Sequence, residues 1–153
     1  MTINTDDMVR DFVLNTKVIF EDNMASLGLK EIYTEDVLIV PSYPSIAISC
    51  SSIWGTPRTL GSISVRYELV FVGEIWYYHS SVSPDIRKNL VMEHAYRVSN
   101  RLIQKASLNN WLVNTRAVFR NCVYIPRLRS GTLLASARIT FTAPYQATIA
   151  TIT

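Results

Sequence analysis

Several residue types that would point to particular chemistry are scarce in this chain of 153 residues. The five glycines form no loop that could cradle a nucleotide phosphate. The two histidines, His79 and His94, have no metal-ligand spacing, and Glu93 adjoins His94 instead of standing four residues away. No serine lies in a nucleophile-elbow motif. We therefore expect a protein that is not an enzyme and that has no cofactor or metal.

Cysteine and long apolar runs are also scarce. Cys50 and Cys122 each lie in a strand-like segment without metal-ligand spacing, so we expect buried free thiols, as in a reducing compartment. A disulfide would require their two strands to be neighbours. No apolar run approaches the ~20 residues of a membrane span, and the N-terminus lacks the pattern of a secretory signal. No membrane partner is expected.

Acidic residues are absent from residues 94–153, which carry eight lysines and arginines. Residues 1–36, in contrast, hold eight acids and three basic residues. The formal net charge of +3 hides this separation. Such an asymmetry indicates an acidic or nucleic-acid partner, or a head-to-tail contact between copies of the chain.

Two segments have the apolar periodicity of helices. The stronger one spans residues 83–106 and opens with Ser83, a capping residue, followed by a proline and an aspartate that suit a first turn. Its apolar residues recur every three or four positions and predict one buried stripe. A second helix is predicted over residues 6–27, with Gly28 as the left-handed residue that ends it.

Apolar and polar residues alternate in most of the remaining segments, as in strands with one buried face. Strand-like segments cover residues 34–40, 46–50, 63–72, 117–125 and 133–142. The last two predict an antiparallel hairpin around a turn at residues 126–131. Residues 51–62 are expected to form an ordered loop, and residues 144–153 a C-terminal tail after Pro144. Residues 74–79 either continue the preceding strand past Gly73 or form a projecting loop.

These segments predict an α+β fold: a mainly antiparallel sheet of about four to five strands with two helices packed on one face. Residues 1–143 are expected to form a single domain, long enough to bury a core.

The basic residues of the second half are the main candidates for contacts with partners. Three follow one stripe of the long helix, two lie on the hairpin strands and two at its turn: Arg97, Arg101 and Lys105; Arg120 and Arg138; Arg127 and Arg129. Such residues could simply face solvent, or contact phosphates or acidic residues of a neighbouring subunit. No DNA-reading motif is present in the sequence.

Two groups of loop residues are further contact candidates. Trp54 and Arg58 lie in the predicted loop 51–62. Three successive aromatic residues also cannot all face one core, so at least one of them is expected at a surface contact: Trp76, Tyr77 and Tyr78.

The order of elements over residues 6–143 resembles that of the tail terminator (tail completion) proteins of tailed bacteriophages, of the phage lambda-like type. Four stretches carry the resemblance: Pro44 to Ile48 entering a strand, Ile63 to Val72, Ser83-Pro84-Asp85 opening the long helix, and Ala137 to Phe141 in the last strand.

The resemblance implies a structural virion protein, assembled in the host cytoplasm. It implies a six-membered ring at the head-proximal end of the tail, which stops tail-tube growth and joins tail to head. The implied partners are further copies of the chain, the tail tube protein, head–tail connector and other neck proteins, and genomic DNA passing through the lumen. The listed arginines would then face neighbouring subunits, and some of them the lumen.

Two alternatives stay open at this point. One is another neck component, such as a head–tail joining or stopper protein. The other is a small nucleic-acid-binding module, which the basic half of the sequence would suit.

Overall fold

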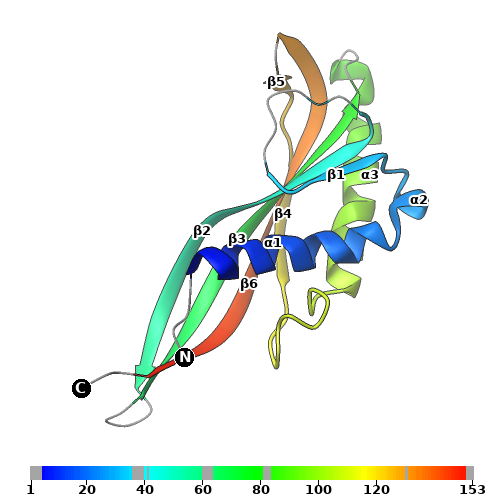
Figure 1. Ribbon diagram of the computed structural model, residues 1–153. Helices are drawn as coiled ribbons and strands as arrows, with labels where there is room; N and C mark the ends of the chain where they lie inside the picture. The colour runs from blue at the N-terminus through cyan, green and yellow to red at the C-terminus, as the bar shows by residue number, and fades with distance from the viewer. Residues whose placement is uncertain are drawn as a thin grey trace.

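The chain forms a layer of helices on a long, mostly antiparallel sheet (Figure 1). The computed structural model describes the backbone of residues 5–35, 40, 42–59, 64–80, 84–129 and 131–150. Its helices are α1 (Thr5–Glu21), α2 (Met24–Leu27) and α3 (Pro84–Gln104). Its strands are β1 (Glu31–Tyr33), β2 (Ser45–Thr59), β3 (Ser64–Ser80), β4 (Val118–Tyr124), β5 (Arg127–Arg129) and β6 (Thr132–Ala150).

The sheet has the order β1-β2-β3-β6-β4, and β5 pairs with β6 outside this path. The β1–β2 pair is parallel, and the other described pairs are antiparallel. The predicted α+β class and the mainly antiparallel sheet are confirmed, with six strands in place of the four to five expected. The centre of the sheet is the long β3–β6 pair, which runs from Ser64 opposite Ala150 to Ser80 opposite Ala135.

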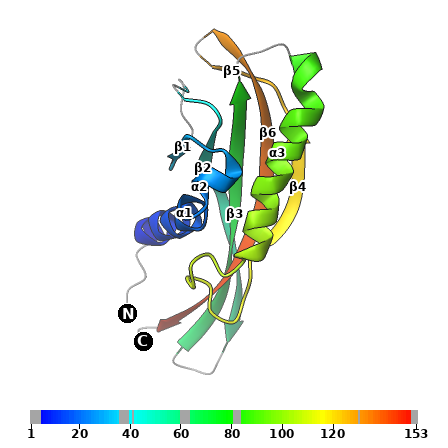
Figure 2. The ribbon, with the colours of Figure 1, turned by 90° about the vertical axis from the view of Figure 1, so that its right-hand side faces the viewer.

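The helices α1 and α3 lie on the same face of the sheet, as predicted (Figures 1 and 2). Their inward residues join one main core with alternate residues of β2, β3 and β6. The stripe of the long helix is buried as its periodicity predicted: Val91, Ala95, Val98 and Leu102 are at most 1% exposed. Ser83, the expected cap, lies outside the described residues.

The predicted first helix is broken in two after Glu21. Gly28 ends the second piece with a φ of 69°, the left-handed conformation expected of it. The sequence predicts a strand at residues 34–40, but the strand found in this region is β1, at residues 31–33. The described residues of the predicted segment, 34, 35 and 40, are not in a strand, and residues 36–39 lie outside the described part. A predicted turn at residues 126–131 contains the short strand β5.

A group of aromatic rings joins α1, β3, β6 and the loop that follows α3. The Phe12 ring on α1 lies 5.3 Å from that of Phe71 and 5.6 Å from that of Phe141. Gly73 makes room for this contact, because a Cβ at position 73 would overlap the Phe141 ring and lie 2.9 Å from Phe12 Cζ. The strand β3 therefore continues through Gly73, which settles the alternative left open by the sequence.

The sheet extends well beyond the helices. At one end β2, β3 and β6 continue as a three-stranded extension, and neither α1 nor α3 lies over it (Figures 1 and 2). The far end of β2 belongs to the extension (Figure 1). Residues 52–59 pair with β3 and Ser51 also lies in β2, so the prediction of a loop at 51–62 is wrong for residues 51–59. A bulge between Cys50 and Ser52 takes up one extra residue, and just beyond it the sheet is still covered, because Phe71 opposite Ile53 packs on Phe12 of α1.

The predicted C-terminal tail is also wrong as far as it is described, because β6 continues through Pro144 to Ala150. The pairing of β4 with β6 begins at Val118, opposite Thr142, and does not reach Pro144. At Pro144 β6 therefore pairs with β3 on one side, and its other edge, towards β4, is outside the strand pairing. Proline lacks an N–H and is tolerated at such an edge. Residues 151–153 of the predicted tail lie outside the described residues.

The two cysteines are free. Cys50 lies on β2 and Cys122 on β4, with β3 and β6 between them. Three strand spacings of about 4.8 Å separate the two positions, which is too far for a disulfide. Burial raises the pKa of both thiols above the ordinary value, which lowers their thiolate fraction near neutral pH.

The close contact at Gly73 yields a stability prediction. We expect Gly73→Ala to lower the free energy of unfolding by about 1–3 kcal/mol, because the new methyl group forces the Phe141 and Phe12 rings apart. Gly55→Ala, at an exposed position of β2, is the matched control and should change it by less than about 0.5 kcal/mol. Urea unfolding of both variants measures this. Equal stability of Gly73→Ala and the wild type would show that the rings do not need the space.

Candidate functional site

Three of the predicted contact arginines lie together on the face of the sheet that the helices leave open. Arg127 and Arg138 contact or pair with Trp76, whose side chain belongs to the second, smaller core on that face. Arg120 is the extra residue of a bulge in β4 and donates from Nε to the hydroxyl of Thr142, 3.0 Å away. The sequence did not indicate that these three arginines share one face.

Arg127 is the most constrained of them. Its guanidinium carbon lies 3.7 Å from the centre of the Trp76 ring, a cation–π geometry. Its Nη1 also donates to the hydroxyl of Tyr78, at 2.9 Å. Arg127 thus covers the outer side of the small core and holds the β5 segment against the sheet.

Arg138 is half-buried between two neighbours across the strands, Trp76 on β3 and Val123 on β4. Its Nε is buried, and no protein group of the structure accepts a hydrogen bond from it. The acid nearest in register is Glu74, opposite Thr140. Among the described side chains, none forms an ion pair with Arg138. Its charge therefore remains available on the open face.

The aromatic contact candidates occupy other places than predicted. Trp76, Tyr77 and Tyr78 are all buried, at 7%, 0% and 0% exposure, so the prediction that one of them lies at the surface is wrong. Strand alternation sends Tyr77 to the helix side and the other two to the open side, and each side has its own core. Trp54, on β2, is 55% exposed and therefore remains a candidate for a contact with a partner.

The backbone of Arg58, the other candidate of the predicted loop, lies in β2 opposite Arg66. The side chain of Arg58 is outside the described part.

The basic stripe of α3 is divided between two roles. Arg97 is exposed and forms an ion pair with Glu93 at 3.2 Å, one helical turn away. Arg101 donates from Nε to the backbone oxygen of Ile19 at 2.9 Å and so ties α3 to α1. Lys105 is exposed. Lys105 and Arg101 both line a polar hollow of about 210 Å³ between the ends of these helices.

The two histidines lie close together, which their sequence positions did not indicate. Their ring centres are 5.1 Å apart, and His79 Nδ1 lies 3.0 Å from the Tyr77 hydroxyl. Burial raises the pKa of Tyr77, and the nearby charge of Arg97 opposes this. Within the described residues, no three histidine, cysteine or acidic side chains gather in a way that could hold a metal.

Sequence reasoning missed an exposed apolar pair at the tip of the β5–β6 hairpin. Leu128 and Leu133 lie directly opposite each other and are 63% and 45% exposed. Arg129, predicted at the turn, lies next to this pair on β5, and its Nη1 donates to the Leu128 carbonyl oxygen. Alternation of basic and apolar residues over residues 127–129 is the sequence signal for this pair, but the expectation for these residues is a turn and not a strand.

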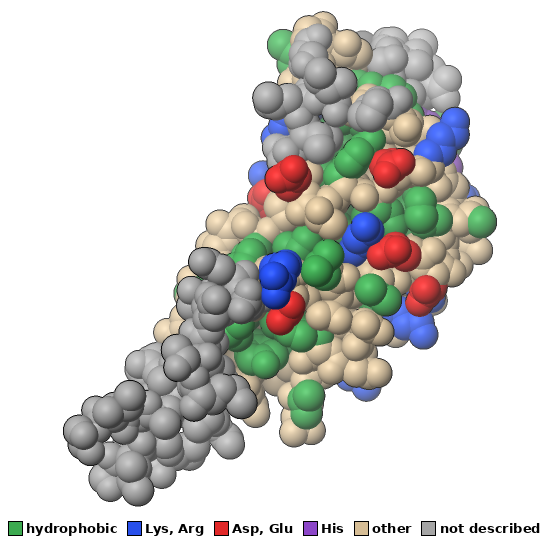
Figure 3. Space-filling view, viewed as in Figure 1, with side chains coloured by type: hydrophobic (Ala, Val, Ile, Leu, Met, Phe, Trp, Pro, Cys, Tyr) green, Lys and Arg blue, Asp and Glu red, His purple; other side chains and the backbone are tan. Residues whose placement is uncertain are grey.

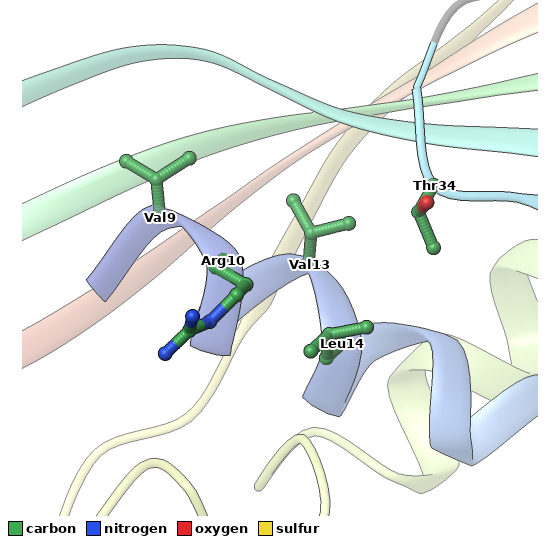
Figure 4. Close-up of a pocket in the computed structure, with 5 residues that line it drawn as sticks. All are labelled: Val9, Arg10, Val13, Leu14 and Thr34. Carbon is green, nitrogen blue, oxygen red and sulfur yellow. The ribbon is translucent and has the colours of Figure 1, made fainter. Parts of the chain in front are cut away.

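A second apolar surface lies beside α1, on the side of the helix towards Thr34. There a hollow of about 310 Å³ is lined by Val9, Arg10, Val13, Leu14 and Thr34 (Figure 4). Leu14 is 43% exposed. In Figure 3, apolar side chains are visible on the face that presents this helix.

Acidic residues gather near that surface, at the end of α1 and around β1. The exposed ones are Glu21, Asp22, Glu31 and Glu35. None of these four forms an ion pair with another described residue. Figure 3 shows acidic side chains on this face with basic ones among them, and Arg10 and Lys30 are also exposed. The arginines of the open sheet face belong to other elements.

No protein-family model matches the chain, and no curated protein sequence matches it. In the described part of the chain, none of the helices combines the length and apolar character that crossing a bilayer requires.

The two arginines of α3 should differ in their effect on stability. Replacing Arg101 by methionine removes a charged donor from the half-buried Ile19 carbonyl and should cost about 1.5–3 kcal/mol of unfolding free energy. Arg97→Met removes an exposed ion pair and should cost about 0.5 kcal/mol or less. Thermal and urea unfolding measure the loss of stability of each variant relative to the wild type. Equal losses would mean that Arg101 does not join the helices in solution.

Proposed function

We propose that this chain is a structural protein of a phage virion that forms a ring at the head-proximal end of the tail, ends tail-tube polymerisation and joins tail to head. The proposal starts from the sequence resemblance, and the three-stranded extension of the sheet is the structural observation that supports it most. A sheet needs a second layer to bury its faces. The extension of β2, β3 and β6 passes beyond α1 and α3, so neighbouring molecules are the natural source of that layer.

The distribution of charge supports contacts between copies. The unpaired acids Glu21, Asp22, Glu31 and Glu35 lie around α1 and β1, and the open sheet face carries Arg120 and Arg138. A contact between two different surfaces of identical subunits is heterologous, and such contacts build a closed ring when the rotation between copies permits. The chain offers two different surfaces for such a contact, one with more exposed acids than bases and one that carries arginines.

The basic face also suits the passage of DNA. Arg120 uses Nε for Thr142, which leaves the rest of its guanidinium exposed, and Arg138 is only half-buried. In a ring, arginines that face the lumen would meet the phosphates of the genomic DNA, and each contact would add salt-dependent affinity. The tail tube protein and the neck proteins would bind the two flat sides of the ring.

The nearest competing function is that of another neck component, such as a head–tail joining or stopper protein. A second alternative is a small nucleic-acid-binding module, which the arginines on the open face favour. An enzymatic role is the most distant alternative. The His79–His94 pair lies beside the Tyr77 hydroxyl, and the described residues contain no group of three histidine, cysteine or acidic side chains that could hold a metal.

The mass and shape of the assembly test the proposal. We expect native mass spectrometry of the full chain to give six copies, and electron microscopy of the same sample to show a ring with a central opening. A ring of twelve would favour a head–tail joining protein.

A monomer at all concentrations would contradict the ring. If that monomer bound duplex DNA with an affinity that falls steeply with salt, the nucleic-acid-binding module would take its place.

A further inference from the structure

We infer that the tip of the β5–β6 hairpin inserts its two leucines into the apolar hollow on α1 of a second copy of this chain. The inference specifies the contact between subunits and rests on the proposed ring. It starts from two exposed apolar surfaces that lie on different elements of the same molecule, one projecting and one hollow.

Successive residue pairs of the β5–β6 hairpin face opposite sides of it, one side buried and the other exposed. Leu134 is buried in the small core of the open sheet face, and Arg127 opposite it contacts Trp76 on that face. The next pair along, Leu128 and Leu133, points to the other side because side chains alternate along strands. Two leucines directly opposite each other lie about 5 Å apart at Cβ. The hairpin that carries these two exposed leucines lies at one end of the molecule (Figure 1).

The hollow on α1 has matching chemistry and size. Val9, Val13 and Leu14 form its apolar wall, and Thr34 lies across from them (Figure 4). An apolar cavity of about 150 Å³ holds a benzene-sized group, so a hollow of about 310 Å³ is large enough for two leucine side chains.

Charge favours the same pairing. The hairpin lies in the part of the chain that has no acidic residue, and Arg129 adjoins its leucines. Beside the hollow, Glu35 follows Thr34, and Glu31 lies on the same short segment; both are exposed and neither forms an ion pair with a described residue. Arg10 also lines the hollow, and its Nε lies 3.9 Å from Asp11 Oδ1. With Glu31 and Glu35 exposed beside this pair, a basic tip meets a margin that has more acids than bases, which a contact between two identical tips would not provide.

The contact is heterologous, because the tip and the hollow lie on different elements. An apolar projection that fits a hollow elsewhere on the same protein links copies head to tail. Two leucines are too few to hold an interface alone. They act as its central anchor, in the way that a few buried residues dominate larger interfaces.

Sedimentation velocity of the full chain tests the anchor. The tip variant carries Leu128→Ser and Leu133→Ser, and the hollow variant carries Leu14→Ser. Ile103→Ser and Val113→Ser are matched controls, because those side chains are 51% and 68% exposed on other surfaces. We expect the concentration at which half of the chain is assembled to rise at least tenfold in the tip and hollow variants and to stay within twofold in the controls. Circular dichroism confirms that each variant is folded.

Mixing the two assembly-deficient variants identifies the pairing. The tip of the hollow variant is intact, and so is the hollow of the tip variant. An equal mixture should therefore form a dimer with one junction, whereas each variant alone stays monomeric. A mixture that remains monomeric would overturn the pairing.

The inference and the proposed function fail in different ways. If the wild type forms rings and the tip variant forms them equally well, the leucines face solvent or another protein of the particle, and the inference fails while the ring stands. If the wild type never assembles, both fail.

Discussion

The ring of Phe141 occupies the space above Gly73, and the arrangement of the other elements depends on this contact. Phe12 packs on the same place and fixes α1 across the sheet. Trp111 then stacks on Tyr145 with 4.6 Å between the ring centres, which holds the loop after α3 against β6. These rings therefore tie α1 and the loop after α3 to the two central strands of the sheet.

The parts of the fold that local pattern decides could be predicted. The long helix has a buried stripe and a proline at its start, and the closing hairpin alternates clearly; both are confirmed. The errors at residues 51–59 and 144–150 share one cause. Gly55, Pro57 and Pro144 are read as breaks, but a strand tolerates them where long-range pairing supplies a partner. Nothing local in the sequence indicates that pairing.

The candidate contact residues were harder to place, for a related reason. A helical stripe shows that Arg97 and Arg101 share a side, but not that the carbonyl of Ile19 lies within reach of one of them. Strand alternation separates Tyr77 from its two neighbours, but the second core that covers Trp76 and Tyr78 is built by distant segments. Residue type predicted which side chains have suitable chemistry, and only the fold determines which of them remain exposed.

The pairing of the two central strands also governs how the chain reaches this structure. Ser64 pairs with Ala150 and Ser80 with Ala135, so each rung between β3 and β6 closes a loop of more than fifty residues. Contacts so distant in sequence slow folding, because chain entropy is lost before they form. On the ribosome β6 is made well after β3, and until it emerges β3 presents an open, aromatic-rich edge. Such an edge invites pairing with other chains, so a chaperone that shields β3 would favour native folding over aggregation.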